Sequence, residues 1–275
     1  GNQWQSLSTA SLRALSQAQW AGLDPIDLRS LNSRQWRSLD GEDFAALTPS
    51  QWAGLLPANI NSLASEQWQY MSVTDLRSLQ PSQWALLSVE RLDEIDGAQW
   101  ASLTPDSLRS VLPQQWAQFQ TEDLKSLSQA QWASLGTATI AALQTAQWAS
   151  MASDDLRGLL QSQWERVSTA GLQALASGQW AALLADDLRG LTSPQWQSIA
   201  TDDLNAITAA QWGFVLSNQL RAMTSAQWSA MTTDDLNALT ASQWSQTGMV
   251  WLSALSTSQW GSMTTDDLRG LGIEH

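Results

Sequence analysis

One unit of the sequence reads QWASMASDDLRGLLQS over residues 147–162. The Gln-Trp pair that opens this unit recurs every sixteen residues from Gln3-Trp4 to Gln259-Trp260, which places seventeen of the eighteen tryptophans in phase. Spacing this strict predicts repeated copies of one structural unit that bury their apolar sides against their neighbours. We therefore expect a single repeat array over residues 1–275, built from about seventeen Gln-Trp units.

Within the unit, the apolar positions Trp148, Met151, Leu156 and Leu159 alternate spacings of three and five residues. A β-strand is excluded because odd steps would place successive apolar side chains on opposite faces. A continuous α-helix is excluded because sixteen residues at about 100° each rotate the apolar stripe by roughly 160° per repeat. The chain must therefore turn every eight residues, and each repeat consists of two octads, one centred on Trp and one on Leu.

Helix-capping residues mark the start of each octad. Ser, Thr, Asp or Asn commonly stands four residues before the central Trp or Leu, and Gln or Asp stands directly before it, as in Thr240 with Gln243 and Thr232 with Asp235. This spacing is typical of a capping box, in which two side chains satisfy each other's main-chain amides. Each octad is thus predicted to form a helix of about six or seven residues, which is too short to be stable alone.

These patterns predict an all-α fold, a thin α-solenoid of 16-residue repeats in which each repeat forms two short α- or 3₁₀-helices around a Trp/Leu ladder core. We expect each repeat to form one layer of the stack. The structural ladder is predicted at Gln147, Trp148, Gln163, Trp164, Gln179 and Trp180. Trp occupies the place that Leu, Ile or Phe fills in the sister octad, which favours a buried row; the alternative is an exposed aromatic row that grips a ligand. The glutamines act as helix caps, or form a stack of amides between layers.

Charged residues also keep to fixed places in the repeat. Asp frequently precedes the central Leu, where a carboxylate stabilises the first turn of a helix; the alternative is a cation-binding ladder. Basic residues follow the central Leu and predict a solvated line with Asp-Arg contacts between layers, or a ligand-binding row. These basic residues are Arg13, Arg29, Arg77, Arg109, Lys125, Arg157, Arg189, Arg221 and Arg269.

The period is broken most clearly at residues 247–251. Thr247 replaces an apolar residue and Trp251 replaces the residue before the central Leu. We interpret this as local repacking in which Trp251 covers the gap at Thr247; alternatively, Met249 and Trp251 form an exposed contact point. The charge-rich segment 91–96 is interpreted as surface variation.

Composition limits the functional classes. The net charge of −13 disfavours nucleic-acid binding, because phosphates would be repelled. Cysteine is absent and no apolar stretch is long enough for membrane insertion. The only histidine is His275, and no acid, base or nucleophile stands apart from the repeat, so we expect no enzyme, no metal site and no cofactor.

The octad pattern, seen in LTASQWS (239–245) and MTTDDLRGL (263–271), resembles short Leu-Thr-x-x-Gln repeats of very large bacterial surface or secreted proteins. Those repeats carry Val, Ile or Leu after the Gln, where this chain has Trp. The resemblance implies a secreted structural or adhesive stretch.

Together these features predict a non-catalytic structural repeat protein, an extracellular or cell-surface spacer, filament or scaffold. The alternative is a binding module whose regular face fits a periodic ligand such as a polysaccharide or an extended peptide. Because solenoid ends without polar caps expose their core, we also expect a longer native array, or protein–protein self-association through the array ends.

Overall fold

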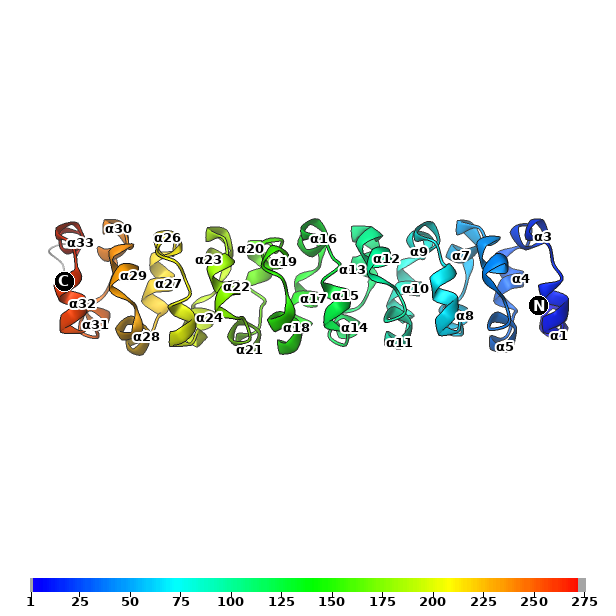
Figure 1. Cartoon of the computed structure of the whole chain (residues 1–275), viewed down its shortest axis with the longest axis horizontal. Coiled ribbons are helices and arrows are strands. Elements are labelled where there is room, and N and C mark those ends of the chain that lie inside the picture. Colours follow the sequence, from blue (N-terminus) through cyan, green and yellow to red (C-terminus); the bar gives the residue numbers. More distant parts are fainter. Residues whose placement is uncertain (1, 272–275) are drawn as a thin grey trace. The chain divides into compact units, whose positions relative to one another are not determined.

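The computed structural model describes residues 2–271, which form short helices joined by sharp linkers (Figure 1). The described part contains 33 α-helices and one 3₁₀-helix and no strand. The predicted all-α repeat fold is confirmed. Contacts between Cα atoms divide the chain into unit 1, Gly1–Ala142, and unit 2, Leu143–His275, and the two units are described separately. That the whole chain acts as one array stays a prediction.

Unit 1 contains the helices α1 (Asn2–Ser6), α2 (Thr9–Arg13), α3 (Gln17–Ala21), α4 (Pro25–Arg29), α5 (Ser33–Trp36), α6 (Gly41–Ala45), α7 (Pro49–Gly54), α8 (Pro57–Asn61), η1 (Ser65–Tyr70), α9 (Val73–Ser78), α10 (Pro81–Leu86), α11 (Val89–Leu92), α12 (Gly97–Ser102), α13 (Pro105–Ser110), α14 (Pro113–Trp116), α15 (Thr121–Leu124), α16 (Gln129–Ser134) and α17 (Thr137–Ala142).

Unit 2 contains the helices α18 (Thr145–Ser150), α19 (Ser153–Arg157), α20 (Gln161–Trp164), α21 (Thr169–Gln173), α22 (Ser177–Ala182), α23 (Ala185–Gly190), α24 (Ser193–Ser198), α25 (Thr201–Leu204), α26 (Ala209–Trp212), α27 (Ser217–Ala222), α28 (Ser225–Ala230), α29 (Thr233–Asn237), α30 (Ala241–Trp244), α31 (Met249–Leu252), α32 (Thr257–Ser262) and α33 (Thr265–Gly270).

The capping residues set where each helix begins. Thr240 has an extended backbone, with φ −77° and ψ 156°, and its hydroxyl accepts a hydrogen bond from the amide of Gln243 at 3.3 Å. In return, the side-chain oxygen of Gln243 accepts from the amide of Thr240 at 2.6 Å. The reciprocal pair satisfies two amides that the short helix leaves free. Thr232 and Asp235 form the same arrangement, so both predicted capping boxes are present.

Each helix packs mainly against the helix three places along the chain. In unit 1, α10 contacts α13 and α14 contacts α17; in unit 2, α20 contacts α23 and α30 contacts α33. Helix α10 begins at Pro81 and α13 at Pro105, so one turn of the stack takes 24 residues. The expected layer of one 16-residue repeat is therefore wrong, because three octads and not two complete a turn.

The number of octads in a turn is odd, and this determines which octads stack on each other. Because Trp and Leu octads alternate along the chain, a helix carrying Trp stacks on a helix carrying Leu in the next turn, as α20 with Trp164 stacks on α23 with Leu188. Each bulky indole is thus followed on the same side of the core by a smaller aliphatic side chain, which suits dense packing.

The core of each unit is a column of these central side chains. From Trp20 to Trp244 every in-phase tryptophan is at most 1% exposed, and the central Leu residues between them, such as Leu156 and Leu188, are buried as well. Burial of one such side chain contributes about 2–3 kcal/mol. This contribution stabilises helices of four to six residues that would not form alone. The predicted Trp/Leu core is confirmed.

Candidate functional site

In most repeats the glutamine before the Trp bridges two turns. In Gln195, the side-chain oxygen accepts from the amide of Thr192 at 2.6 Å, and Nε2 donates to the carbonyl oxygens of Trp164 at 2.8 Å and Val167 at 2.7 Å. One buried side chain therefore satisfies an amide at the start of its own helix and two carbonyl groups of the preceding turn. The same three bonds occur in unit 1 at Gln51, Gln83 and Gln131.

The structure brings together part of the predicted ladder. Gln179 donates to the carbonyl oxygens of Trp148 at 3.0 Å and Met151 at 2.8 Å, and the rings of Trp148 and Trp164 lie 6.4 Å apart between centroids. Gln147, Gln163 and Trp180 are also buried. In these contacts the glutamine amides donate to main-chain carbonyl groups and not to one another. The expected stack of amides is therefore replaced by hydrogen bonds from side chain to backbone.

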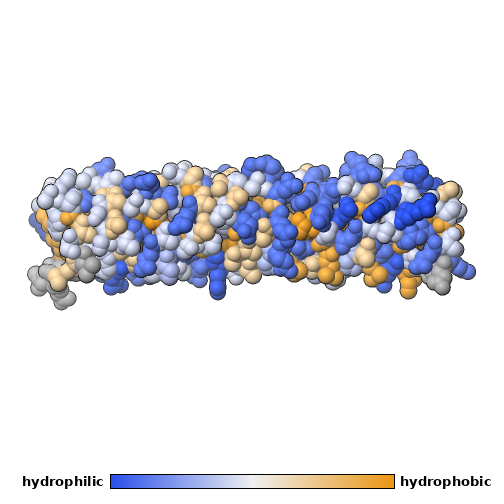
Figure 2. All heavy atoms as spheres, turned by 90° about the horizontal axis from the view of Figure 1, so that it is seen from below, coloured by the Kyte–Doolittle hydropathy of each residue, from blue (hydrophilic) through white to orange (hydrophobic). Residues whose placement is uncertain are grey.

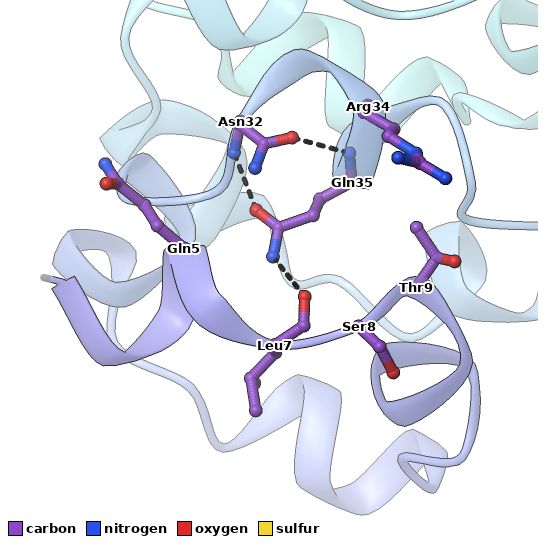
Figure 3. Close-up of a pocket in the computed structure, with 7 residues that line it drawn as sticks. All are labelled: Gln5, Leu7, Ser8, Thr9, Asn32, Arg34 and Gln35. Carbon is purple, nitrogen blue, oxygen red and sulfur yellow. Dashed lines mark hydrogen bonds between the residues drawn. The ribbon is translucent and has the colours of Figure 1, made fainter.

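A pocket in unit 1 displays the glutamine bridge near the surface (Figure 3). Gln35 exchanges hydrogen bonds with Asn32, and its Nε2 donates to the carbonyl oxygen of Leu7 at 2.9 Å. The pocket has a volume of about 280 Å³ and is also lined by Gln5, Ser8, Thr9 and Arg34. A smaller hollow of about 190 Å³ lies beside Arg77 and Ser107. Both are open, mainly polar hollows.

Two indole groups in unit 2 bond carboxylates of the following turn. Trp164 Nε1 donates to Asp187 at 2.9 Å, and Trp244 Nε1 donates to Asp267 at 3.1 Å. In both pairs, the helix that carries the aspartate has a glycine where it lies against the helix that carries the tryptophan. A Cβ atom on Gly190 would lie 2.7 Å from the carbonyl oxygen of Gln161. The absence of a side chain there allows the helices to approach closely enough for the indole to reach the carboxylate.

Most of the other buried indoles described have no acceptor, whether or not an aspartate stands at this place: Nε1 of Trp52 and of Trp212 lacks a partner although Asp75 and Asp235 stand 23 residues later. Gly171 stands in the place of Asp187, and a Cβ atom on it would lie 2.8 Å from Nε1 of Trp148. Within the part of the chain that the structure describes, Nε1 of Trp148 is buried without a hydrogen-bond partner. The residue before the central Leu therefore has a second role beyond helix capping, because it faces the indole of the preceding turn.

Several of these aspartates are harder to ionise than usual. Burial raises the pKa of Asp187, although hydrogen bonds from the amide of Leu184 and from the indole of Trp164 act in the opposite direction. Burial likewise raises the pKa of Asp43 and Asp203. In residues 2–271 no group of three or more acidic or histidine side chains is arranged to hold a metal ion, and the aspartates instead bond amides and indoles.

Several of the basic residues that follow the central Leu donate hydrogen bonds to the backbone of the next turn. Arg157 Nε donates to the carbonyl oxygen of Ala182 at 2.9 Å, Arg77 Nε to that of Ser102 at 2.8 Å, and Arg29 Nε to that of Gly54. The direct ion pairs run along one helix, as between Arg157 and Asp154 at 3.1 Å. The basic side chains thus bond carbonyl groups at helix ends, where a positive charge is favourable.

At the break in the period, the structure separates the two residues of the predicted contact point. Met249 is 68% exposed, whereas Trp251 is partly buried and its indole donates to the carbonyl oxygen of Met223 at 2.9 Å. This carbonyl stands 28 residues earlier, as does one of the two acceptors of a bridging glutamine, so Trp251 makes one of the two bonds of a glutamine bridge. Thr247 is buried, and its hydroxyl donates to the carbonyl oxygen of Gln243 at 2.9 Å.

The view in Figure 2 shows hydrophilic and hydrophobic residues interspersed on one face. None of the helices described has the length and hydropathy needed to cross a membrane. His275 lies outside the described residues. Comparison with protein-family models and with curated protein sequences gave no match.

Sequence reasoning missed most of these contacts between turns. The repetition of glutamine directly before each Trp indicated that this residue has a structural role. Its carbonyl acceptors could not be identified, because they lie 28 and 31 residues earlier and this separation depends on how many residues make one turn of the stack. The charged residues of segment 91–96 are partly or fully exposed, as the interpretation of surface variation expects, although Oδ1 of Asp93 is buried without a partner among residues 2–271. The sequence offered one signal of this unusual environment, because Asp93 stands where several other units have Arg.

Proposed function

We propose that this chain is a non-catalytic structural repeat protein that serves as a spacer or scaffold. The observation that carries the proposal is the glutamine bridge, which recurs in both units and commits the buried polar groups to joining one turn to the next. Such a column gains stability from every added turn, as expected of a stack in which each repeat contacts only its neighbours.

The proposal extends to an extracellular or cell-surface setting. Its support is the low content of charged residues, 14%, the abundance of amide and hydroxyl side chains, and the resemblance to repeats of bacterial surface proteins. A spacer in this setting must resist extension, and bonds between turns oppose the separation of the turns.

The test is to stretch the full chain between handles in optical tweezers. Each unit should unfold in a sharp step that releases up to about 440–510 Å of chain, given the lengths of the two units and about 3.3–3.6 Å per extended residue. Gln195→Leu should lower the rupture force of unit 2 and leave that of unit 1 unchanged, while Gln197→Leu, at an exposed site of the same helix, serves as the control. Smooth extension without a rupture step would contradict a mechanical role.

The alternative is a binding module for a polysaccharide or an extended peptide. Burial of the tryptophan row leaves this alternative without its expected aromatic face, although Tyr70 and Phe214 are individually exposed. Screening the chain against a panel of immobilised glycans distinguishes the two functions. Specific binding that is lost in Phe214→Ala or Tyr70→Ala would favour the module over the spacer.

A further inference from the structure

Ser107 stands at a place in the repeat from which a longer side chain reaches the preceding turn. It directly precedes the central Leu108, as Gln219 precedes Leu220 in unit 2. Ser107 is only 6% exposed, and its hydroxyl lies 3.0 Å from that of Thr104 in the same octad. Within the described chain, Ser107 therefore makes no hydrogen bond to another turn.

Gln219 shows what a longer side chain does at this place. Its Oε1 accepts a hydrogen bond from the amide of Leu216 at 3.0 Å, and its Nε2 donates to the carbonyl oxygens of Leu188 at 2.9 Å and Leu191 at 2.8 Å. One primary amide thus fits between an N–H group at the start of its own helix and two carbonyl groups of the preceding turn.

The corresponding backbone groups surround Ser107. The amide three residues earlier is that of Thr104, and the carbonyl group 28 residues earlier is that of Leu79. Helix α13 packs on α10 as α27 packs on α24, and Thr104, with φ −75° and ψ 155°, has nearly the backbone conformation of Leu216, with φ −74° and ψ 146°. Among residues 2–271, neither the Thr104 amide nor the Leu79 carbonyl oxygen forms a hydrogen bond. A donor and an acceptor that one amide joins at Gln219 are thus unpaired here.

The hollow of about 190 Å³ in unit 1 is lined by Ser107, Thr104 and Leu79 together. The pocket of Figure 3 lies at the equivalent place three turns earlier, and there the side-chain amide of Gln35 donates to the carbonyl oxygen of Leu7 at 2.9 Å. Because one water molecule takes about 30 Å³ in the liquid, the hollow beside Ser107 has room for a group of several heavy atoms.

The charged groups at the rim of this hollow have partners. Arg77 Nε donates to the carbonyl oxygen of Ser102 at 2.8 Å, and Asp106 forms an ion pair with Arg109. An ionic ligand would have to compete with these partners, whereas a neutral one would not. The unpaired backbone groups match a neutral ligand that carries an acceptor and a donor on one small group, as a primary carboxamide does.

We propose that this hollow is a binding site for a primary carboxamide, whose oxygen accepts from the amide of Thr104 and whose NH₂ group donates to the carbonyl oxygen of Leu79. The ligand supplies the bridge that Gln219 makes from within the chain, so it joins α13 to the end of α9. The carboxamide belongs to a small amide or to a Gln or Asn side chain of an extended peptide. The site does not depend on the spacer function, and either can fail without the other.

Titration of the ¹⁵N-labelled full chain with acetamide, followed by NMR, tests the site. The amide signals of Thr104 and Ser107 should shift and saturate, with half-saturation on the order of 10–100 mM for so small a ligand. N,N-dimethylacetamide keeps the acceptor oxygen but has no N–H group, so it should bind at least about tenfold more weakly.

A blocked Ala-Ala-Gln-Ala-Ala peptide distinguishes the two sources of the carboxamide. Tighter binding than that of acetamide, lost when Glu replaces Gln in the peptide, assigns the site to a peptide side chain. Binding of acetamide that the peptide does not exceed assigns it to a small amide.

Ser107→Gln supplies the amide from within the chain. It should abolish the saturable shift at Thr104 and slow hydrogen exchange of the Leu108 amide, which bonds the carbonyl oxygen of Thr104, by about tenfold. Ser50→Gln makes the same exchange at an exposed position of α7 and should change neither result. Ser107→Ala keeps the hollow and its unpaired backbone groups, so acetamide should still bind.

The proposal is overturned if neither acetamide nor the peptide gives a saturable shift at Thr104, or if the shift persists in Ser107→Gln. It is also overturned if N,N-dimethylacetamide binds as tightly as acetamide, because the site would then not use the donor group. The comparison of the two amides is made on the unaltered chain and so does not depend on how well Ser107→Gln folds.

Discussion

Replacing Gln195 by Leu tests the central feature of the stack. Leu is apolar and of similar length, and it removes the three bonds to the amide of Thr192 and the carbonyl groups of Trp164 and Val167. Each bond contributes about 1 kcal/mol net, and buried groups left without partners cost more, whereas added apolar burial offsets about 1 kcal/mol. We expect unit 2 to lose about 2–4 kcal/mol.

The assay is urea unfolding followed by circular dichroism, together with hydrogen exchange of the amides of α20 and α24. Gln197→Leu, on the exposed side of the same helix, controls for helix propensity and should change stability by less than about 0.5 kcal/mol. Gln195→Glu keeps the acceptor oxygen but directs a carboxylate at two carbonyl oxygens, so its cost at pH 7 should exceed that of Leu and decrease on acidification. A difference below about 1 kcal/mol between Gln195→Leu and Gln197→Leu would refute the bridge as a main stabilising element.

Two further predictions follow from the packing. Gly190→Ala should destabilise unit 2 by about 1–3 kcal/mol, because the added Cβ would lie 2.8 Å from Cβ of Trp164, and it should shift the NMR signal of the Trp164 indole N–H. Gly178→Ala, with open space around its Cβ, is the matched control and should be neutral or stabilising by up to about 1 kcal/mol; equal effects at the two sites would contradict the close-approach argument. Tryptophan emission should be blue-shifted and protected from acrylamide, with Trp260, 37% exposed, supplying much of the quenched signal; uniform quenching that persists in Trp260→Phe would contradict the buried row.

The candidate contacts could be predicted only in part. Thr240 with Gln243 could be recognised as a capping box because both partners lie within one helical turn. The carbonyl acceptors of Gln195 could not, because they belong to another turn of the stack. Trp164 illustrates the same limit, because its acceptor Asp187 stands 23 residues later, a spacing that only the fold defines.

The sequence by itself determined the local structure: odd apolar spacings and caps every eight residues dictate short helices, and the repeated Trp and Leu dictate their buried side. Only the tertiary structure decided that three helices complete a turn, because local spacing fixes which face of a helix is apolar and leaves the direction of the following linker open. That direction depends on how indole and aliphatic side chains fill a shared core. Once the turn takes 24 residues, Trp octads stack on Leu octads, and the indole of Trp164 meets the carboxylate of Asp187.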